Sequence, residues 1–242
     1  MNPGEFDQFW TNSVDSIRHA LEHFFELSNQ QRHSEEIHHQ KWIVISAALA
    51  AESFFKAVLL QANEEISNGD TYHSLPRTIQ ALKPLRLPKS ESLITKVAKK
   101  VSDQRDEILH RPYDSEIELS HSAILLFGLL KVIERRVDDR PTGIVAECQL
   151  LSQEMLAQIK HTSLAEYKRV INQFVAEDYS DQPVEPCPEC GANSVLVLAG
   201  ECVACFADLG HVTCEQCGEG RFYSLDAGDP GCETCFQQSA AI

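Results

Sequence analysis

Apolar side chains recur at three- and four-residue steps through most of the first 137 residues. This spacing places them on one face of an α-helix, so it predicts a series of amphipathic helices. The stretch SNGDTYHSLP interrupts the pattern with Ser, Asn, Gly and Pro, which indicates a loop. The helices are expected over Phe6 to Phe25, Ile37 to Leu59, Thr78 to Leu82, Ser90 to His110 and Glu116 to Val137. Because their connections are short and show no strand-type alternation, we predict an antiparallel helical bundle.

The rest of the chain has a different organisation. Pro141 and Gly143 end the helical series, and one further amphipathic stretch runs from about Val145 to Glu177. The polar, proline-containing stretch DYSDQPVEP that follows is typical of a linker. The expected parts are a bundle over residues 1–140, an additional long helix with its connector over residues 141–180, and a separate module over residues 181–242.

The composition fits a globular protein that does not enter a membrane. A chain of 242 residues with 43% apolar side chains is long enough for a packed core. Its longest apolar run is interrupted by Glu52 and Lys56, and the run SAILLFGLLKVI is too short to span a bilayer. The first residues do not have the pattern of a secretory leader. A cytoplasmic location is therefore expected.

Eight of the nine cysteines lie in the final module, all in Cys-x2-Cys pairs. The pairs form two repeated units, CPECG with CVACF and then CEQCG with CETCF. Two cysteines with this spacing can bind one tetrahedral ion, and a glycine permits the tight turn beside the sulfurs. The spacing therefore predicts two zinc sites with four thiolates each. The predicted ligands are Cys187, Cys190, Cys202 and Cys205 in the first site, and Cys214, Cys217, Cys232 and Cys235 in the second.

Other interpretations of these cysteines are interleaved pairing of the same eight ligands, redox dithiols and an iron–sulfur cluster. The repeat favours sequential pairing, and thiolate ligands suit a reducing compartment. Four thiolates leave no open position on the metal, so both Zn²⁺ ions are predicted to be structural, and a zinc-dependent hydrolase is disfavoured. The predicted fold is thus mainly α, a helical bundle followed by a small zinc-ribbon region with short β-hairpins.

Charge is unevenly spread along the chain. The net charge is −15, and the final module carries ten acidic residues against one basic residue, Arg221. Such a module would repel a phosphate backbone, so it is expected to bind a protein or the basic face of the bundle itself. Residues 77–111 have the opposite sign, with nine basic and four acidic side chains. They form either a solvated helix face or a patch that binds a polyanion.

The segment SDQRDEILHRPY, residues 102–113, combines an arginine, a carboxylate and a histidine on one predicted helix. At about 100° per residue, Arg105 falls inside the apolar stripe of that helix. An arginine there must reach solvent, pair with a carboxylate or face an interface. Asp106 and His110 lie four residues apart, close enough for the carboxylate to hydrogen-bond the imidazole. The Arg-Pro pair that follows stops the helix, which puts His110 in its last turn.

An arginine, four residues and a histidine at the end of a bundle helix resemble the signature of the HEPN family. In that signature a small polar residue commonly follows the arginine, and Asp106 meets this condition. The stretch ALAAESFFKAVL, with Glu52 and Lys56 four apart, looks like another helix of the family, and YHSLPRTIQAL before the motif is also similar. The resemblance covers about residues 5–137 and leaves out the additional helix and the cysteine-rich module.

Other arginines and histidines of the chain have the same spacing. Arg18 and His23 have this spacing. The family signature allows four to six residues between the arginine and the histidine, and Arg32 is followed by His38 and His39 within that range. In the family, however, the motif closes the helix before the last one of the bundle. Only the pair Arg105 and His110 has that position in this sequence.

The resemblance implies an endoribonuclease that needs no metal ion, of the kind found in toxin and phage-defence systems. It implies that His110 acts as general acid or base, that Arg105 stabilises charge on the phosphorane, and that Asp106 orients the imidazole. Family members commonly dimerise with their motifs facing each other, so a homodimer is implied as well. RNA would then follow the basic residues of the motif helix. These are Lys96, Lys99, Lys100 and Arg111.

A second interpretation is a non-catalytic dimeric scaffold whose acidic zinc ribbons recruit a protein partner. Arg105 would then only pair with Glu52 or another carboxylate of the bundle, and His110 would only cap its helix. RNA cleavage that depends on both of these side chains distinguishes the two interpretations.

Overall fold

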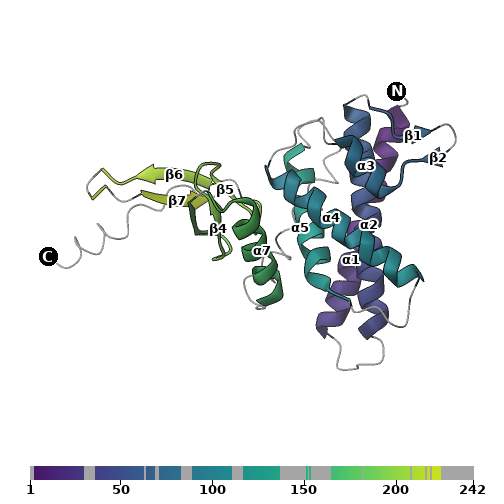
Figure 1. The fold of residues 1–242 in the computed structure, drawn as a ribbon, viewed down its shortest axis with the longest axis horizontal. Coiled ribbons are helices and arrows are strands. Elements are labelled where there is room, and N and C mark those ends of the chain that lie inside the picture. The colour runs from purple at the N-terminus through teal and green to yellow at the C-terminus, as the bar shows by residue number, and fades with distance from the viewer. Residues whose placement is uncertain are drawn as a thin grey trace. The chain divides into compact units, whose positions relative to one another are not determined.

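The chain divides into two compact units, Met1–Met155 and Leu156–Ile242. Figure 1 shows the structure, a computed structural model, in which the first unit is built of helices and the second combines a helix with short strands. The residues that the structure describes are 3–29, 36–62, 64–68, 71–82, 89–110, 117–136, 151, 153, 165–181, 183–207, 209–215, 217–218 and 220–224.

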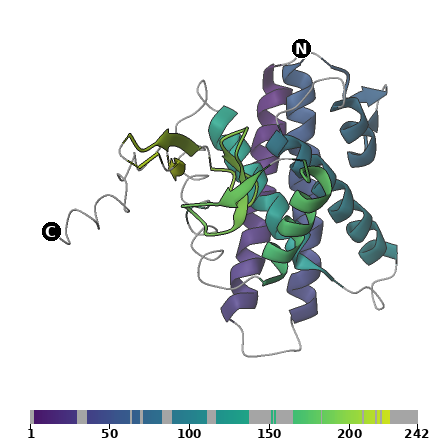
Figure 2. The same cartoon turned by 60° about the vertical axis from the view of Figure 1, so that its left-hand side comes forward.

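α1 (Pro3–Asn29) and α2 (Glu36–Gln61) form a long antiparallel hairpin, and they lie side by side in both ribbon views (Figures 1 and 2). The middle of α2 is rich in alanine, and Ala47 and Ala50 are fully buried there. Small side chains let the two helix backbones approach closely. The Ser13 hydroxyl of α1 donates to the carbonyl oxygen of Ala50 at 3.0 Å.

A short β-hairpin follows α2 where the sequence pattern predicted only a loop. β1 (Ser67–Asn68) pairs antiparallel with β2 (Thr71–Tyr72), since the Asn and Gly that indicate a loop are also the residues of tight hairpin turns. α3 (Leu75–Leu82) begins three residues earlier than predicted. Pro76 lies in its first turn, where a helix needs no N–H from that residue, so proline starts this helix instead of delaying it.

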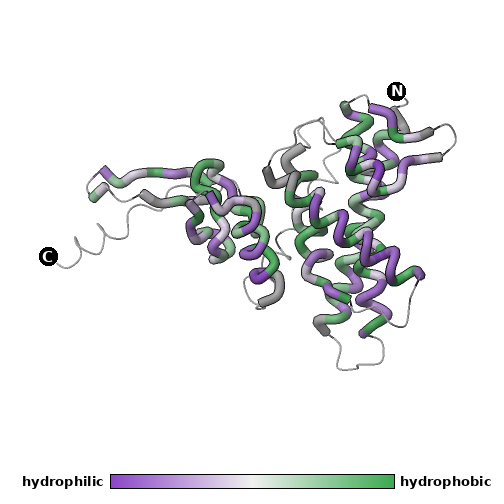
Figure 3. The backbone as a smooth tube through the Cα atoms, viewed as in Figure 1, coloured by the Kyte–Doolittle hydropathy of each residue, from purple (hydrophilic) through white to green (hydrophobic). Residues whose placement is uncertain are grey.

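α4 (Lys89–His110) and α5 (Leu119–Arg136) belong to the same bundle and pack against α2 and against each other. α4 has two different sides. Ile94, Val101 and Ile108 are buried on its inner side, whereas much of its length is hydrophilic in Figure 3. This burial confirms the apolar stripe predicted for the helix.

Within the part of the chain that the structure describes, α2 is a helix long and apolar enough to cross a membrane. However, 72% of its apolar window is buried inside the bundle, and a buried core helix passes the same test of length and composition. Two charged residues of α2, Glu52 and Lys56, form an ion pair with each other.

The second unit contains α7 (Ala165–Asp178), the described end of the amphipathic stretch predicted from Val145 to Glu177. Most of that stretch before Ala165 lies outside the described residues. Ile171 and Val175 of α7 are buried, and the helix packs against strand β4 of the sheet that follows.

In the described part of the second unit, two small antiparallel sheets follow α7. The first has the order β3-β4-β5, with strands β3 (Val184–Pro186), β4 (Asn193–Leu196) and β5 (Glu201–Cys202). The second is the hairpin of β6 (Leu209–Thr213) and β7 (Gly220–Ser224). In this hairpin Gly210 lies opposite Tyr223, and any side chain at Gly210 would overlap the tyrosine ring. A helical bundle followed by small hairpin sheets is the mainly α fold that the sequence predicted.

Candidate functional site

Arg105 lies in the apolar stripe of α4, and its side chain is only 16% exposed. Its neighbours in the stripe, Val101 and Ile108, are 0% and 3% exposed. An arginine keeps its charge at any physiological pH, and burying an unpaired charge is costly. The position therefore requires a nearby carboxylate, and the bundle provides two.

Asp106 and Glu52 both contact the guanidinium of Arg105. The Oδ1 atom of Asp106 accepts a hydrogen bond from Nε at 3.0 Å and another from Nη2 at 2.7 Å. The Oε2 atom of Glu52 lies 3.6 Å from Nη1. Because Glu52 belongs to α2 and Asp106 to α4, the guanidinium is held from two helices and its orientation is fixed.

Glu52 also binds a second cation one turn further along α2. Its Oε1 atom accepts a hydrogen bond from Nζ of Lys56 at 2.6 Å. The Lys56 side chain is 7% exposed, and its ammonium lies 5.7 Å from the ring centroid of Phe9 and 5.4 Å from that of Tyr72. Two cations and two carboxylates thus balance each other. We call this group the Arg105 network; its members are Lys56, Glu52, Arg105 and Asp106.

The expected pairing of Asp106 with His110 does not form. Asp106 bonds Arg105 instead, and in the described part of α4 no hydrogen bond joins it to His110. The planar guanidinium offers one carboxylate two charge-assisted hydrogen bonds, whereas an exposed imidazole offers one. His110 is the last residue of α4 and is exposed to solvent.

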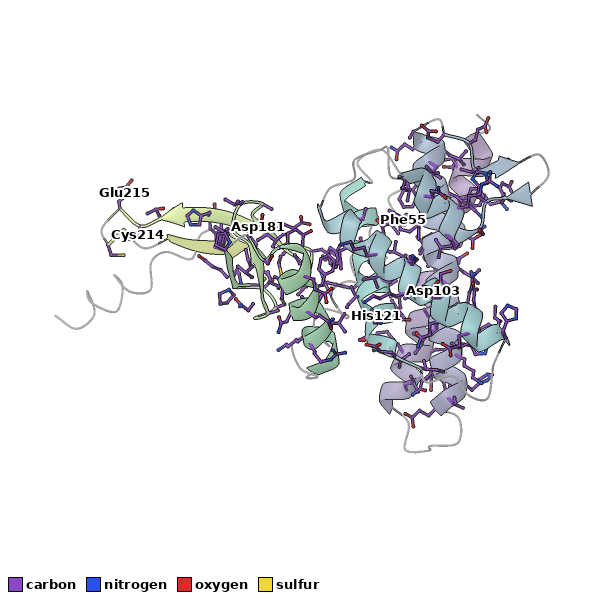
Figure 4. The ribbon with its side chains drawn as sticks, in the orientation of Figure 1. Phe55, Asp103, His121, Asp181, Cys214 and Glu215 are labelled. Carbon is purple, nitrogen blue, oxygen red and sulfur yellow. The ribbon has the colours of Figure 1, made fainter. Side chains whose placement is uncertain are left out.

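The lysines predicted to bind RNA lie on the exposed surface of α4. Lys96, Lys99 and Lys100 are all exposed, whereas Arg111 lies outside the described residues. Exposed acidic side chains follow them along the helix, beginning at Asp103, which Figure 4 labels. Positive charge is therefore concentrated in the middle of α4, and its C-terminal part carries both signs.

Four cysteines of the second unit gather around one point. Their Sγ atoms all lie within 4.8 Å of one another, and all four side chains are buried. The Sγ atoms of Cys187 and Cys205 are 3.6 Å apart, and those of Cys190 and Cys202 are 3.7 Å apart. This cysteine group can hold a metal ion, and it combines the two Cys-x2-Cys pairs of the first repeated unit.

The residue after the second cysteine shapes each of these pairs. Gly191 (φ 69°) and Phe206 (φ 58°) have left-handed backbone conformations. Their N–H groups donate to the carbonyl oxygens of Cys187 and Cys202 at 2.9 and 2.8 Å. Glycine adopts this conformation freely, but for phenylalanine it costs about 1–2 kcal/mol. The Phe206 side chain is only 1% exposed, so its packing offsets the strain.

Further hydrogen bonds reach the sulfur atoms. The backbone N–H groups of Glu189 and Cys205 lie 3.3 Å from Cys187 Sγ and 3.4 Å from Cys202 Sγ. Ser194 is fully buried in β4, and its Oγ atom lies 3.2 Å from Cys202 Sγ. Such partners orient thiolate ligands and stabilise their charge. No local sequence signal identifies Ser194, because its position depends on how β4 pairs with β5.

The four thiol groups contact one another, so the pKa of each depends on the other three. Hydrogen bonding from Cys190, then from Cys202 and Cys205, lowers the pKa of Cys187, whereas hydrogen bonding to Cys187 raises the pKa of Cys205. Four thiolates this close would repel one another, and a divalent cation between them would remove the repulsion. An all-sulfur donor set favours soft or borderline metal ions.

The structure describes half of the second predicted ligand set. Cys214 follows β6, as Figure 4 shows, and Cys217 is exposed. Gly218 has a φ of 75°, and its N–H donates to the carbonyl oxygen of Cys214 at 2.8 Å. This turn therefore has the same backbone geometry as the turns that end at Gly191 and Phe206 in the cysteine group. Cys232 and Cys235 lie outside the described residues.

The chain matches no family model, no curated protein and no solved structure. Its chemistry therefore has to follow from its own side chains. The Arg105 network offers a fixed cation on the helix that ends at an exposed imidazole. The cysteine group offers four buried sulfur ligands.

Proposed function

We propose that the helical unit is a metal-independent endoribonuclease of the HEPN type. The contact of Glu52 with Arg105 at 3.6 Å carries this proposal. The two residues belong to the two separate stretches that resemble the family, one on α2 and one on α4. Their contact holds the guanidinium of Arg105 in place at the motif. The exposed imidazole of His110 lies further along the same helix.

In the proposed reaction the ribose 2′-hydroxyl attacks the adjacent phosphate. Arg105 stabilises the negative charge that develops on the phosphorane. His110 accepts the proton of the 2′-hydroxyl as general base or donates one to the leaving 5′-oxygen as general acid. The products are a 2′,3′-cyclic phosphate and a 5′-hydroxyl. Asp106 holds the guanidinium and not the imidazole, because its hydrogen bonds go to Arg105.

A single chain offers only half of this site. Arg105 and His110 are separated by a helical rise of about 7.5 Å and lie on different sides of α4. In a homodimer with facing motifs, Arg105 of one copy would meet His110 of the other. Leu109, next to His110, is 59% exposed and offers an apolar contact for such an interface.

RNA would lie along the basic middle of α4. Lys96, Lys99 and Lys100 would neutralise its phosphates, and Arg111 would extend this row toward the motif. The protein would act in the cytoplasm as a toxin or phage-defence nuclease. The acidic second unit would bind a protein partner, because its charge repels RNA.

For the second unit the proposed role is structural zinc binding. Four buried sulfur atoms around one point suit a tetrahedral Zn²⁺ ion that keeps no position for water. Cys214 and Cys217, with Cys232 and Cys235, would hold a second Zn²⁺ ion. Neither ion would take part in the RNA chemistry.

A non-catalytic scaffold is the second candidate, and one observation favours it. The guanidinium of Arg105 is already engaged by two carboxylates, as it would be in a purely structural ion-pair network. In this case the bundle would only dimerise, and the zinc ribbons would recruit a protein partner.

An RNA-cleavage assay in EDTA separates the candidates. It compares the full-length protein with Arg105→Ala, His110→Ala and two matched controls, Arg18→Ala and His211→Ala. Arg18 has the same spacing to a histidine but pairs with Asp15 on α1 at 2.7 Å, and His211 is exposed in β6. The two motif variants should each lose roughly 100- to 1,000-fold in rate, while the controls should cleave like the wild type.

The products and the pattern across variants decide the outcome. Fragments that end in a 2′,3′-cyclic phosphate support attack by the 2′-hydroxyl. Equal RNA decay in all five proteins, or decay in none, removes the nuclease and leaves the scaffold.

A further inference from the structure

Four histidines gather where the C-terminal part of α1 faces the start of α2. His19 and His23 lie four residues apart on α1 and therefore share one face of the helix. His38 and His39 belong to the first turns of α2. These are four of the ten histidines in the chain, and the Arg105 network uses none of them.

The hairpin brings ring nitrogens from both helices into direct contact. The Nδ1 atoms of His23 and His39 are 2.8 Å apart. The rings of His19 and His23 meet edge to face, with centroids 4.7 Å apart, and the ring of His38 lies 6.2 Å from that of His39. His19 uses its Nδ1 atom for a hydrogen bond with Ser46 at 2.8 Å, so its Nε2 atom is the one that a ligand can use.

A short contact between two imidazole nitrogens can hold either a shared proton or a cation. Metal–imidazole bonds are about 2.0–2.1 Å long, so two imidazoles on one tetrahedral ion have their nitrogens roughly 3–3.5 Å apart. Opening the contact between His23 and His39 by less than about 1 Å would therefore admit an ion. Both side chains are partly exposed, so an ion can enter from solvent.

The protonation of the cluster is compatible with ligation. Burial, followed by the charges of His19, His39 and His38, lowers the pKa of His23, while Glu22 acts in the opposite direction. A lowered pKa favours the neutral form of the His23 ring, which is the form that binds metal ions.

We propose that His23 and His39 are the anchoring ligands of a transition-metal site that bridges α1 and α2. His19 lies beside His23, with ring centroids 4.7 Å apart, and water completes the coordination. Imidazole donors select a first-row ion such as Ni²⁺, Cu²⁺ or Zn²⁺ over Mg²⁺ or Ca²⁺. The bound ion would fasten the α1–α2 hairpin at this end. The site differs from the cysteine group in its ligand chemistry and lies in the other unit.

Trp42 provides a built-in probe of this cluster. Its indole stacks on His23 with centroids 6.3 Å apart, lies edge-on to His19 at 5.7 Å, and donates from Nε1 to Nε2 of His38 at 3.1 Å. The chain has two tryptophans, so Trp10→Phe leaves Trp42 as the only one. A paramagnetic ion at His23 and His39 would quench its fluorescence at short range.

The experiment titrates NiCl₂ into the full-length, zinc-loaded Trp10→Phe protein near neutral pH and follows tryptophan fluorescence. Zinc loading keeps Ni²⁺ from the cysteines. We expect saturable quenching that becomes about tenfold weaker in affinity, or more, in His23→Gln and in His39→Gln. Glutamine keeps a hydrogen-bonding group of similar size at each position. His211→Gln, an exposed histidine of the second unit, is the matched control and should titrate like the parent.

Thermal unfolding provides the second readout. Ni²⁺ should raise the unfolding temperature of the bundle in the wild type and in His211→Gln, but not in His23→Gln or His39→Gln. Far-UV circular dichroism without Ni²⁺ shows whether each variant remains folded. Quenching and thermal shifts of equal size in all variants, or a wild type that shows neither, would overturn the proposal. The contact between His23 and His39 would then be a hydrogen bond only.

Discussion

At the scale of single residues, Glu52 holds the Arg105 network together. Its two carboxylate oxygens contact different cations, Lys56 at 2.6 Å and Arg105 at 3.6 Å. Lys56 is almost buried, and its aromatic neighbours attract the ammonium without neutralising it. Without Glu52, two cations would face each other across the helices with one carboxylate, that of Asp106, remaining beside Arg105.

We therefore expect Glu52→Gln to destabilise the bundle strongly. Breaking a buried ion pair costs about 3–5 kcal/mol, and the 22% exposure of the Glu52 side chain lowers our expectation to about 2–3 kcal/mol. The free energy of unfolding in urea measures the loss.

Two further variants show whether charge is the cause. Asp106→Asn removes a carboxylate that is 51% exposed, so it should cost at most about 1 kcal/mol. Adding Lys56→Met to Glu52→Gln removes the unpaired ammonium and should restore part of the lost stability. If Asp106→Asn costs as much as Glu52→Gln, the network does not depend on Glu52 in this way.

At the scale of secondary-structure elements, the helices were predictable because burial repeats with the helical period. The stripe of α4 was placed correctly from Ile94, Val101 and Ile108, and the helix begins within one residue of the expected position. The partner of Asp106 was not predictable from α4 alone. It depends on the rotamer of Arg105, which in turn depends on how closely α2 approaches.

The candidate metal ligands also differ in how far the sequence predicts them. Ligands that are close together in the sequence were predictable, and ligands brought together by helix packing were not. The first cysteine group follows directly from its spacing, because both members of each Cys-x2-Cys pair lie in one turn. The contact between His23 and His39 has no such local signal. Only the four-residue step from His19 to His23 is visible in the sequence, and the rest depends on the register of α1 against α2.

We also expect the lysines of α4 to determine how tightly the protein binds RNA. Replacing Lys99 and Lys100 with alanine, in a His110→Ala background that prevents cleavage, should weaken binding equally for different RNA sequences. Each phosphate contact to a single strand contributes about 0.7 to the slope of log affinity against log salt. Losing two contacts should therefore reduce the slope by about 1.4. Fluorescence anisotropy with a labelled RNA at several salt concentrations measures this change.

Lys168→Ala in the same background is the matched control, because Lys168 belongs to α7 in the other unit. It should leave both affinity and salt slope unchanged. A salt slope that stays the same without Lys99 and Lys100 would mean that these lysines do not contact RNA.

At the scale of the whole molecule, two compact units imply two separable stabilities. The sheets of the second unit are short, so the binding of Zn²⁺ by its cysteines should supply much of its folding free energy.

We expect two Zn²⁺ ions per chain and one fewer in Cys202→Ser. In that variant the fold around the first site should be lost and the bundle retained. Zinc analysis after dialysis and far-UV circular dichroism measure both effects. Cys148→Ser, which changes the one cysteine that lies outside the final module, is the control and should keep both ions. Two ions retained in Cys202→Ser would contradict the assigned ligands.

Two defective chains should complement each other if the RNA site is shared between copies. In a mixed dimer of Arg105→Ala and His110→Ala, one site combines the intact Arg105 of one copy with the intact His110 of the other, while the second site lacks both. Random assortment makes half of the dimers mixed, and each has one working site of two. Unfolding and refolding the two variants together should therefore restore about a quarter of wild-type cleavage, although each variant alone stays inactive. Refolding each variant separately and then mixing at low temperature is the control for contamination. If co-refolding restores nothing while size-exclusion chromatography shows mixed dimers, Arg105 and His110 do not form a site between copies.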